Sequence, residues 1–393
     1  MNTELLFCRQ TLVNKKQQIV GYELIVNSEN EETNKANILF ILSSNVDNSS
    51  FPKDRLLFLD LPDEVSSNEF ILKISRQIVF ILPLDMVLTS EKQEFLSFLS
   101  KQGFGFCLNN LNSETIKLFK VANYLKMDIR QIDANRFVQL SSEIHKYPVK
   151  QIADRIETEE AFLTCSKTDV DLMQGNYFIK PRLTVRKTVG PAMVSLFNLM
   201  SMVQSDASVA KMEEVLKRDA ALSYKLLRYI NSVGFGLSCE ITSYAHAVTI
   251  LGYRKLYKWL SLLMVMTASK ETTPQVLIKT AAIRGRFAEL VGQSYLDEAE
   301  RDNLFLAGLF SLLDAVLQMP MQDALKQINL SKDLNDALLK RQGVYSSFID
   351  LVEACEQRDT NKLERVADSL QLTPTVVNSA HLTALSWAET LGI

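Results

Sequence analysis

Two adjacent amides, Asn109 and Asn110, end the apolar run GFGFCLNN at residues 103–110. The aromatics and the glycine at the start of the run are typical of a buried strand. In α/β barrels, polar side chains at the carboxyl ends of strands carry the chemistry. Divalent cations such as Mg²⁺ require charged oxygen ligands, however, and both of these side chains are neutral. The pair therefore marks a candidate site and argues against a metal there.

The elements around this pair alternate between short strand-like runs and helical patterns over the first 180 residues. Such alternation predicts a mostly parallel sheet covered by helices, and the number of runs suits a barrel. The segment is short for eight full strand–helix units, so we expect a modified, shortened TIM-like (β/α) barrel with clipped helices. The predicted strands are ELLFCRQTLV, QIVGYELIV, LLFLDLP, IVFILPL, FGFCLNN and VANYLKMD.

The pattern changes near residue 190, where Pro181, Gly190 and Pro191 punctuate a short basic stretch. Beyond it, apolar residues recur at three- and four-residue spacing, as in PAMVSLFNLMSMV and VTILGYRKLYKWLSLLMVM. This spacing predicts an all-helical domain. We therefore divide the chain into a barrel at 1–181, a linker at 182–191 and a helical domain at 192–393.

Composition excludes several classes of function. The chain is 47% hydrophobic and 23% charged with a formal net charge of -3, so it has no basic field for nucleic acid. The basic and aromatic residues of the segment 253–259 share one predicted helix, where we expect buried aromatics and solvated lysines. The longest apolar stretch, LYKWLSLLMVMTA, is too short to span a bilayer.

The five cysteines are scattered, with no CxxC pair, and the N-terminal residues MNTELLFCRQ do not form a signal peptide. Both observations predict a reducing compartment, and we expect a cytoplasmic protein. Cys8 and Cys107 lie in apolar runs and are expected to be core residues.

The segments GYELIVN at 21–27, LKMD at 125–128, and IADRIETEEAF followed by LMQGNYFIKP resemble the EAL family. That family comprises bacterial cyclic di-GMP phosphodiesterases on a modified TIM barrel. The resemblance covers residues 1–181. It implies a site at which active members hold two Mg or Mn ions with acidic side chains.

Several site positions of the family are kept in this chain. Glu23 is the signature glutamate, and Lys126 and Gln174 are retained. Asp60 stands at an asparagine ligand of the family, and Asp154 replaces a glutamate. Lys126 alternatively pairs with Asp60 or Asp154 across the barrel mouth, as a leftover charge pair without a ligand.

Other positions have lost their charge. Phe80, Asn109 and Asn110 stand where the family has acidic ligands, and Asn27 replaces an arginine that holds a substrate phosphate. In a partly dry pocket each missing charge counts for several kcal/mol on order-of-magnitude Coulomb grounds. The resemblance therefore predicts a vestigial site without metal, a chain that is not an enzyme, and no cofactor. Alternatively, the two amides form a turn that caps the next helix.

The segments RDAALSYKLLRYINSVGFG, ITSYAHAVTILGYRKL and FLAGLFSLLDAV resemble the HDOD domain, a helical relative of HD phosphohydrolases without their catalytic residues. Ser311 and Leu312 stand where HD enzymes have adjacent His and Asp. The chain has only three histidines, His145, His246 and His381, so we predict no metal site. As the groove for a partner or ligand we select the following residues: Asn231, Ser232, Gly234 and His246.

The two resemblances together predict an EAL–HDOD tandem signalling protein. We expect a non-catalytic regulator that acts through protein–protein interaction in cyclic di-GMP-linked motility, pilus or biofilm control. Its expected partners are other signalling or motility proteins and a second copy bound through the barrel, with no nucleic acid and no membrane span. The alternatives are a residual phosphodiesterase that uses Mg or Mn with Glu23, Asp60, Asp154 and Lys126, and a sensor that binds cyclic di-GMP without cutting it.

Overall fold

The computed structural model describes residues 5–26, 55–61, 77–82, 89–111, 116, 118–180, 190–231, 240–268 and 273–392. By its internal contacts the chain divides into two compact units. The first contains Met1–Phe178 together with Ala354–Ser379, and the second contains Ile179–Glu353 with Ala380–Ile393. We call residues 354–379 the return segment, because this part of the C-terminal sequence belongs to the N-terminal unit.

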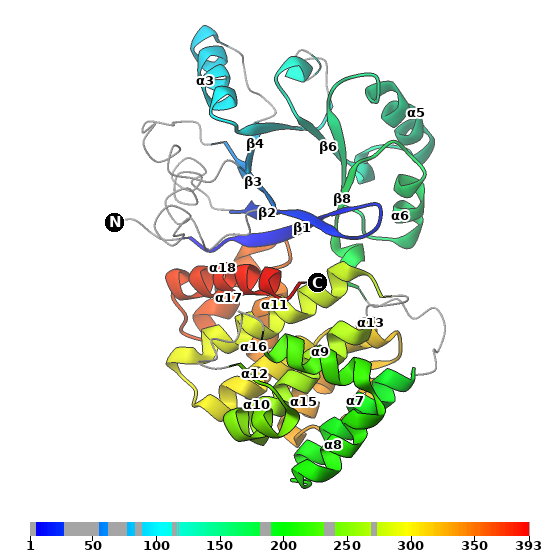
Figure 1. Ribbon diagram of the computed structural model, residues 1–393. Coiled ribbons are helices and arrows are strands. Elements are labelled where there is room, and N and C mark those ends of the chain that lie inside the picture. Colours follow the sequence, from blue (N-terminus) through cyan, green and yellow to red (C-terminus); the bar gives the residue numbers. More distant parts are fainter. Residues whose placement is uncertain are drawn as a thin grey trace. The chain divides into compact units, whose positions relative to one another are not determined.

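The first unit is built on a closed barrel of eight strands that follow one another in chain order (Figure 1). Strands β2 to β8 pair in parallel, whereas β1 is antiparallel to both of its neighbours, β2 and β8. This confirms the predicted modified TIM-like barrel. The strands are β1 (Cys8–Asn14), β2 (Ile19–Ile25), β3 (Leu56–Asp60), β4 (Ile78–Leu82), β5 (Gly105–Asn109), β6 (Tyr124–Asp128), β7 (Lys150–Asp154) and β8 (Leu172–Gln174).

Side chains from several strands fill the barrel interior. Phe58 and Tyr124 meet edge to face, with ring centroids 5.2 Å apart. Leu12, Cys107 and Ile152 belong to the same buried cluster. A packed interior of this kind leaves the ends of the strands as the place for polar chemistry.

The described helical elements of the first unit are short. The acidic run IETEEAF begins α6, whose first turn holds Glu159 and Glu160 and whose N-cap Thr158 accepts from the Ala161 amide. Negative charge at a helix N-terminus is favourable, so the acidic first turn stabilises α6. The elements are α3 (Ser90–Lys101), η1 (Leu118–Lys120), η2 (Ile129–Gln131), α5 (Ala134–Ile144), α6 (Glu159–Ser166) and η3 (Asn176–Ile179), with α17 (Thr360–Ser369) in the return segment.

The second unit is helical throughout its described residues (Figure 1), as predicted. Its helices are α7 (Pro191–Gln204), α8 (Val209–Arg218), α9 (Ala220–Ile230), α10 (Tyr244–Thr267), α11 (Gln275–Val291), η6 (Gly292–Ser294), α12 (Glu298–Phe310), α13 (Leu313–Leu317), α14 (Met321–Leu325), α15 (Lys332–Lys340) and α16 (Val344–Ala354). Helix α18 (Pro374–Thr390) begins in the return segment and ends in this unit. The Asp219 side chain accepts from the Leu222 amide and so caps α9.

Helices α11 and α12 pack closely through Gly308. A Cβ atom at Gly308 would lie 2.4 Å from the carbonyl oxygen of Arg284 on the facing helix. Only glycine permits such a close approach of two backbones. The glycine of the AGLFSL segment therefore serves helix packing, and it brings Arg284 of α11 next to the end of α12.

Candidate functional site at the barrel mouth

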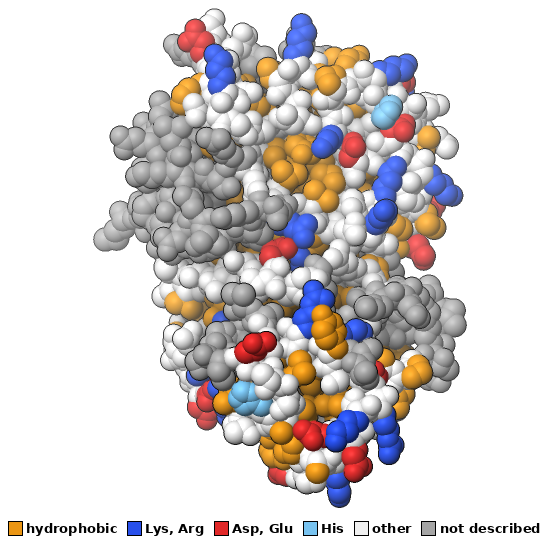
Figure 2. All heavy atoms as spheres, viewed as in Figure 1, with side chains coloured by type: hydrophobic (Ala, Val, Ile, Leu, Met, Phe, Trp, Pro, Cys, Tyr) orange, Lys and Arg blue, Asp and Glu red, His pale blue; other side chains and the backbone are white. Residues whose placement is uncertain are grey.

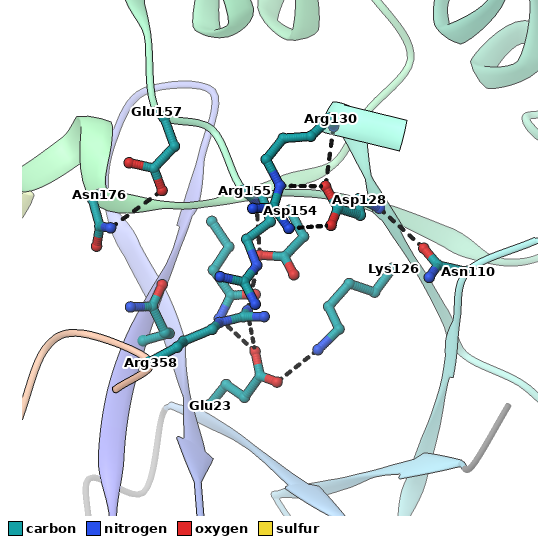
Figure 3. A network of polar contacts seen from close by, with 12 residues as sticks. Glu23, Asn110, Lys126, Asp128, Arg130, Asp154, Arg155, Glu157, Asn176 and Arg358 are labelled. Atoms are coloured by element: carbon teal, nitrogen blue, oxygen red, sulfur yellow. Dashed lines mark hydrogen bonds and ion pairs between the residues drawn. The ribbon is translucent and has the colours of Figure 1, made fainter. Parts of the chain in front are cut away.

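Three of the retained positions meet in one buried cluster (Figure 3). The Lys126 Nζ donates to Glu23 Oε1 at 2.6 Å, and Gln174 Nε2 donates to Glu23 Oε2 at 2.6 Å. Glu23 lies on β2, Lys126 on β6 and Gln174 on β8, and all three side chains are buried. The closed barrel therefore joins residues that are up to 151 positions apart in sequence.

A fourth residue, Arg358 of the return segment, completes this cluster. Its Nη2 donates to Glu23 Oε2 at 3.1 Å and to Asp154 Oδ1 at 2.9 Å (Figure 3). The Arg358 side chain is 15% exposed, and those of Glu23 and Asp154 are 7% and 6% exposed. Arg358 thus bridges two nearly dry carboxylates. Guanidinium hydrogen bonds to carboxylates are among the stronger ones in proteins.

The charges change the protonation of the buried groups. Burial would raise the pKa of Glu23, but Lys126 and Arg358 outweigh this effect and hold the pKa at about 2. Burial would lower the pKa of Lys126, yet Glu23 and Asp154 raise it. Burial raises the pKa of Asp154, and Arg358 and Lys126 offset only part of this rise. Glu23 and Lys126 are therefore a charged pair at neutral pH.

Phe80 and Asn110, which stand where the resemblance implies acidic ligands, make structural contacts. Phe80 on β4 is fully buried and packs on Phe104, with ring centroids 5.4 Å apart. Asn110 follows β5 with a positive φ of 63°, and its backbone amide donates to the Lys126 carbonyl. Its Oδ1 accepts from the Asp128 amide at 3.1 Å, so the Asn110 side chain holds the end of β6. The predicted capping of the next helix falls on residues 112–115, which lie outside the described part, as does Asn27.

The donor set does not fit a pair of divalent cations. Glu23 and Asp154 are already bonded to Lys126 and Arg358, and Asn109 and Asn110 offer amides at the end of β5. Within the described ranges, no group of three or more His, Cys, Asp or Glu residues could hold a metal ion. Hard cations need several anionic oxygens that are free to bind.

Further polar contacts frame the mouth without joining its centre (Figure 3). Asp128 binds Arg130 through two hydrogen bonds, of 3.0 Å from Nε and 2.7 Å from Nη2. The Asn176 amide donates to Glu157 Oε1 at 3.2 Å. Between Gln174 and Asn176, Gly175 has a φ of +148°, and a Cβ there would lie 2.1 Å from the Ile156 carbonyl oxygen. This glycine lets the chain turn directly after Gln174.

The structure therefore sorts the predicted positions. Glu23, Lys126, Asp154 and Gln174 come together, whereas Asp60 and Asn109 end their own strands, β3 and β5. The leftover-pair alternative for Lys126 named Asp60 or Asp154, but its hydrogen bond goes to Glu23. Sequence reasoning missed Arg358, because QRDT at 357–360 lies far from every strand in the sequence. Its only signal was an arginine beside the helix N-cap Asp359.

The predicted groove of the helical unit is described only in part. Asn231 bonds both the amide and the carbonyl of Ile241, each at 2.7 Å, whereas Ser232 and Gly234 lie outside the described residues. His246, at the start of α10, contacts the Thr242 amide and hydroxyl through Nδ1 at 3.4 Å. These contacts give His246 a local structural role.

The other two histidines lie elsewhere. His145 is the C-cap of α5 in the barrel unit, and the buried His381 stacks on Phe287 in the helical unit. The three histidines are thus on three different helices.

In the helical unit, Ser311 lies beside Arg284, which bonds to it. Arg284 Nη1 donates to Ser311 Oγ at 3.0 Å and to Glu353 Oε1 at 3.2 Å. Arg341 also donates to Glu353, at 2.8 Å. The place at which HD enzymes carry adjacent His and Asp therefore lies beside an arginine–carboxylate pair.

The basic residues of segment 253–259 do not form a basic surface. Arg254 and Lys255 pair with Glu298 on α12. Lys258 pairs with Glu289 at 2.5 Å and with Asp302 at 3.1 Å, and its side chain is only 18% exposed. The aromatics Tyr257 and Trp259 are buried as predicted, but the expectation of a solvated Lys258 was wrong, because two carboxylates draw it inward.

Lys255, Lys258 and the carboxylates Glu289, Glu298 and Asp302 also line a cavity of about 420 Å³ in the helical unit, together with Trp259 and Trp387. On the face shown in Figure 2, Lys and Arg side chains are interspersed with Asp and Glu side chains. Within the described residues, no helix is both long enough and apolar enough to cross a membrane.

The comparisons agree with this two-unit architecture, in which a closed barrel with one antiparallel strand accompanies a helical region. Residues 191–342 match the HDOD domain. The chain is 25% identical to "Cyclic di-GMP phosphodiesterase CdgJ" of Vibrio cholerae serotype O1, over 97% of this chain and 91% of that protein. It is 23% identical to "Uncharacterized protein YuxH" of Bacillus subtilis strain 168, over 98% of each.

Solved EAL structures are also similar to part of the chain. An EAL domain protein from Listeria monocytogenes EGD-e has a TM-score of 0.38 at 13% identity, over 45% of this chain and 87% of that one. A standalone EAL protein from Vibrio cholerae O395 in a c-di-GMP bound form has a TM-score of 0.37 at 17% identity, over 49% and 98%. The predicted EAL–HDOD tandem is confirmed, and this chain carries its HDOD domain at residues 191–342.

One prediction needs correction. From the missing acidic ligands we predicted that the chain is not an enzyme. The relative that matches 97% of the chain is named a cyclic di-GMP phosphodiesterase, and this finding overturns that prediction. The number of acidic ligands alone does not describe this mouth, because two side-chain cations, Lys126 and Arg358, also meet Glu23 there.

Proposed function

We propose that this chain acts in cyclic di-GMP signalling as a slow cyclic di-GMP phosphodiesterase with its site at the barrel mouth. The observation that carries the proposal is the buried Glu23–Lys126–Gln174 cluster, which three distant strands assemble at one end of the barrel. The full-length relative named a cyclic di-GMP phosphodiesterase supports the choice of substrate.

The charges at the mouth suit an anionic phosphodiester. Hydrolysis consumes one water, breaks one phosphorus–oxygen ester bond and yields a linear dinucleotide. Lys126 and Arg358 place positive charge where the phosphate would gain negative charge in the transition state. Gln174 Oε1 and Arg358 Nε are buried without a hydrogen-bond partner among the described residues, so both can still bond to a ligand.

Glu23 is the carboxylate best placed to accept a proton from the attacking water. Its pKa of about 2 keeps it ionised at neutral pH and also makes it a weak base. A general base works best when its pKa lies near the working pH. The proposed activity is therefore slow.

Chromatography of cyclic di-GMP incubated with the purified full chain, with Mn²⁺ in the buffer, tests the proposal. We expect a linear dinucleotide to form slowly, and Glu23→Gln to reduce the rate by about a hundredfold, the usual scale for loss of a general base. Glu143→Gln is the matched control, because Glu143 lies on the surface of α5 in an exposed pair with Arg136.

The control variant should keep the wild-type rate. Turnover that is equal in Glu23→Gln and wild type would place the reaction elsewhere. Absence of turnover in wild-type protein that binds cyclic di-GMP in calorimetry would favour the sensor alternative.

We also propose that the output of the chain reaches motility, pilus or biofilm control through contact with other signalling proteins, and that the barrel mediates homodimerisation. Affinity capture from the source cell with the full chain, compared with its Glu23→Gln variant, tests the first point. Light scattering of the purified chain tests the second. A monomer at all concentrations would exclude the homodimer.

A further inference from the structure

The cavity of about 420 Å³ belongs to the helical unit and is separate from the barrel chemistry. Helices α10, α11, α12 and α18 of this unit supply its lining. Its volume lies within the range of roughly 300–1,000 Å³ that is usual for small-molecule sites. The cavity is therefore of a size that suits a small ligand.

Part of the lining is aromatic. Trp259 of α10, Phe305 of α12 and Trp387 of α18 all border the cavity. The rings of Phe305 and Trp387 meet edge to face, with centroids 6.1 Å apart. Leu251 and Leu262 of α10 add aliphatic surface. Aromatic side chains pack well against other flat rings, so this part of the lining favours a ligand with an aromatic ring.

The acidic side chains of the lining are already neutralised. Each of the three carboxylates pairs with two basic side chains. These pairs are Glu289 with Lys258 and Arg286, Glu298 with Arg254 and Lys255, and Asp302 with Arg254 and Lys258. A cationic ligand would have to displace one of these partners, so the lining disfavours a cation.

The basic side chains of the lining are not all neutralised. Arg301 Nε donates to the Asp297 carbonyl at 3.3 Å, and Arg301 forms no ion pair with a carboxylate of the residues that the structure describes. Arg286 bonds to Glu289 through Nη1 at 2.8 Å, and its side chain is 30% exposed. The Arg286 guanidinium also lies 5.9 Å from the ring centroid of Trp387. Guanidinium groups bind carboxylate and phosphate oxygens strongly, so the remaining positive charge favours an anion.

We propose that this cavity binds a small aromatic anion. The ring packs against Trp259 and Trp387, and the carboxylate or phosphate of the ligand bonds to Arg301 and Arg286. The proposal does not rest on the proposed function, because all four residues belong to the helical unit.

Tryptophan fluorescence of the full chain tests the proposal, because the chain has two tryptophans and both line the cavity. The probes are adenosine monophosphate and benzoate, each compared with its uncharged analogue, adenosine or benzamide. We expect at least one anion to quench the fluorescence saturably. It should bind at least about tenfold more tightly than its analogue, which lacks the charge-assisted hydrogen bonds. Preference for adenosine monophosphate would identify a phosphate ligand, and preference for benzoate a carboxylate ligand.

Variants of Arg301 test the anion contact. Arg301→Gln should weaken binding of the preferred anion by about tenfold, because one charged donor is lost, whereas Arg301→Lys should retain most of the affinity. Arg218→Gln is the matched control and should bind like the wild type, because Arg218 is exposed on α8 and does not line the cavity. Unchanged binding by Arg301→Gln would overturn the assignment.

Two results with the wild type would also overturn the proposal, and they hold even where a variant fails to fold. One is the absence of saturable quenching by both anions up to about 1 mM. The other is equal affinity of each anion and its uncharged analogue. Glu23→Gln should bind the preferred anion like the wild type, so failure of the cavity and failure of the proposed phosphodiesterase are distinguishable.

Discussion

The barrel mouth and the region around Ser311 both hold an arginine–carboxylate pair at a place where the resemblances to the EAL family and to HD phosphohydrolases imply a metal, but they do so differently. In the barrel, Glu23 binds two cations and is 7% exposed, and one of these cations comes from the return segment. In the helical unit, Arg284 lies on the packed helix α11, and its partner Glu353 is 22% exposed. The barrel cation is therefore brought by a separate segment, whereas the other belongs to a core helix.

This difference predicts how much each carboxylate contributes to the stability of its unit. A buried carboxylate between two cations is strongly stabilised by them, and its loss leaves Lys126 and Arg358 with Asp154 as their one acidic neighbour in the cluster. A carboxylate such as Glu353, whose side chain is 22% exposed, is partly screened by water, so its loss costs less. Removal of a charged side chain should therefore cost much stability at the barrel mouth and less in the helical unit.

The largest effect is expected from Glu23→Gln. Removal of the carboxylate leaves the buried Lys126 without its ion-pair partner and leaves Arg358 with Asp154 alone, and breaking a buried pair costs about 3–5 kcal/mol. Urea unfolding followed by near-ultraviolet circular dichroism measures this loss in the barrel unit. Glu353→Gln should cost no more than about 1 kcal/mol. Equal losses in the two variants would remove the contrast between the regions.

Glu23 should also make the stability of the barrel unit depend on pH in the acid range. The pKa of Glu23 falls from 4.5 in the unfolded chain to about 2 in the folded one, equivalent to about 3 kcal/mol. Because the folded pKa is the lower one, this stabilisation is present above pH 4.5 and is lost as the pH falls toward 2. Asp154 opposes the trend, since its pKa is raised.

Urea unfolding at a series of pH values from 7 to 3 measures this dependence, and the difference between wild type and Glu23→Gln isolates the Glu23 contribution. The stability difference should shrink steadily below pH 4.5. A difference that stays constant down to pH 3 would show that Glu23 is not a depressed acid.

A smaller loss, of about 2 kcal/mol, is expected from Arg284→Met, because the hydrogen bonds of a charged group to Ser311 and Glu353 are removed. Trp259 and Trp387 are the only tryptophans, and both lie in the helical unit, so tryptophan fluorescence follows this unit selectively. Arg341→Met, which removes the more exposed partner of Glu353, is the comparison variant and should lose less. A larger loss in Arg341→Met than in Arg284→Met would show that the more exposed contact with Glu353 contributes more to stability.

The smallest effect is expected from Arg130→Gln. Arg130 binds Asp128 at the rim of the mouth, but its side chain is 55% exposed. Exposed pairs contribute less than about 1 kcal/mol, so both stability and the proposed turnover should change little. A large loss of turnover with unchanged stability would make Arg130 part of the site.

Much of the architecture could be predicted from the chain alone. Six predicted runs overlap strands β1 to β6, and β7 and β8 were seen only within a motif, because KQIAD and LMQ are too short to show a period. The helices of the second unit follow their apolar spacing closely, as α7 does at 191–204. The positions Glu23, Lys126, Asp154 and Gln174 could be selected from a resemblance, but their mutual bonds could not.

The linear order of residues determined the two types of unit, because the period of apolar residues selects strand or helix locally. It also determined that Asn109 and Asn110 stand where the resemblance implies acidic ligands. Only the tertiary structure decided which cation meets Glu23. Arg358 lies 335 positions away in sequence, and its arrival depends on backbone hydrogen bonds between the return segment and β1, which no local pattern encodes.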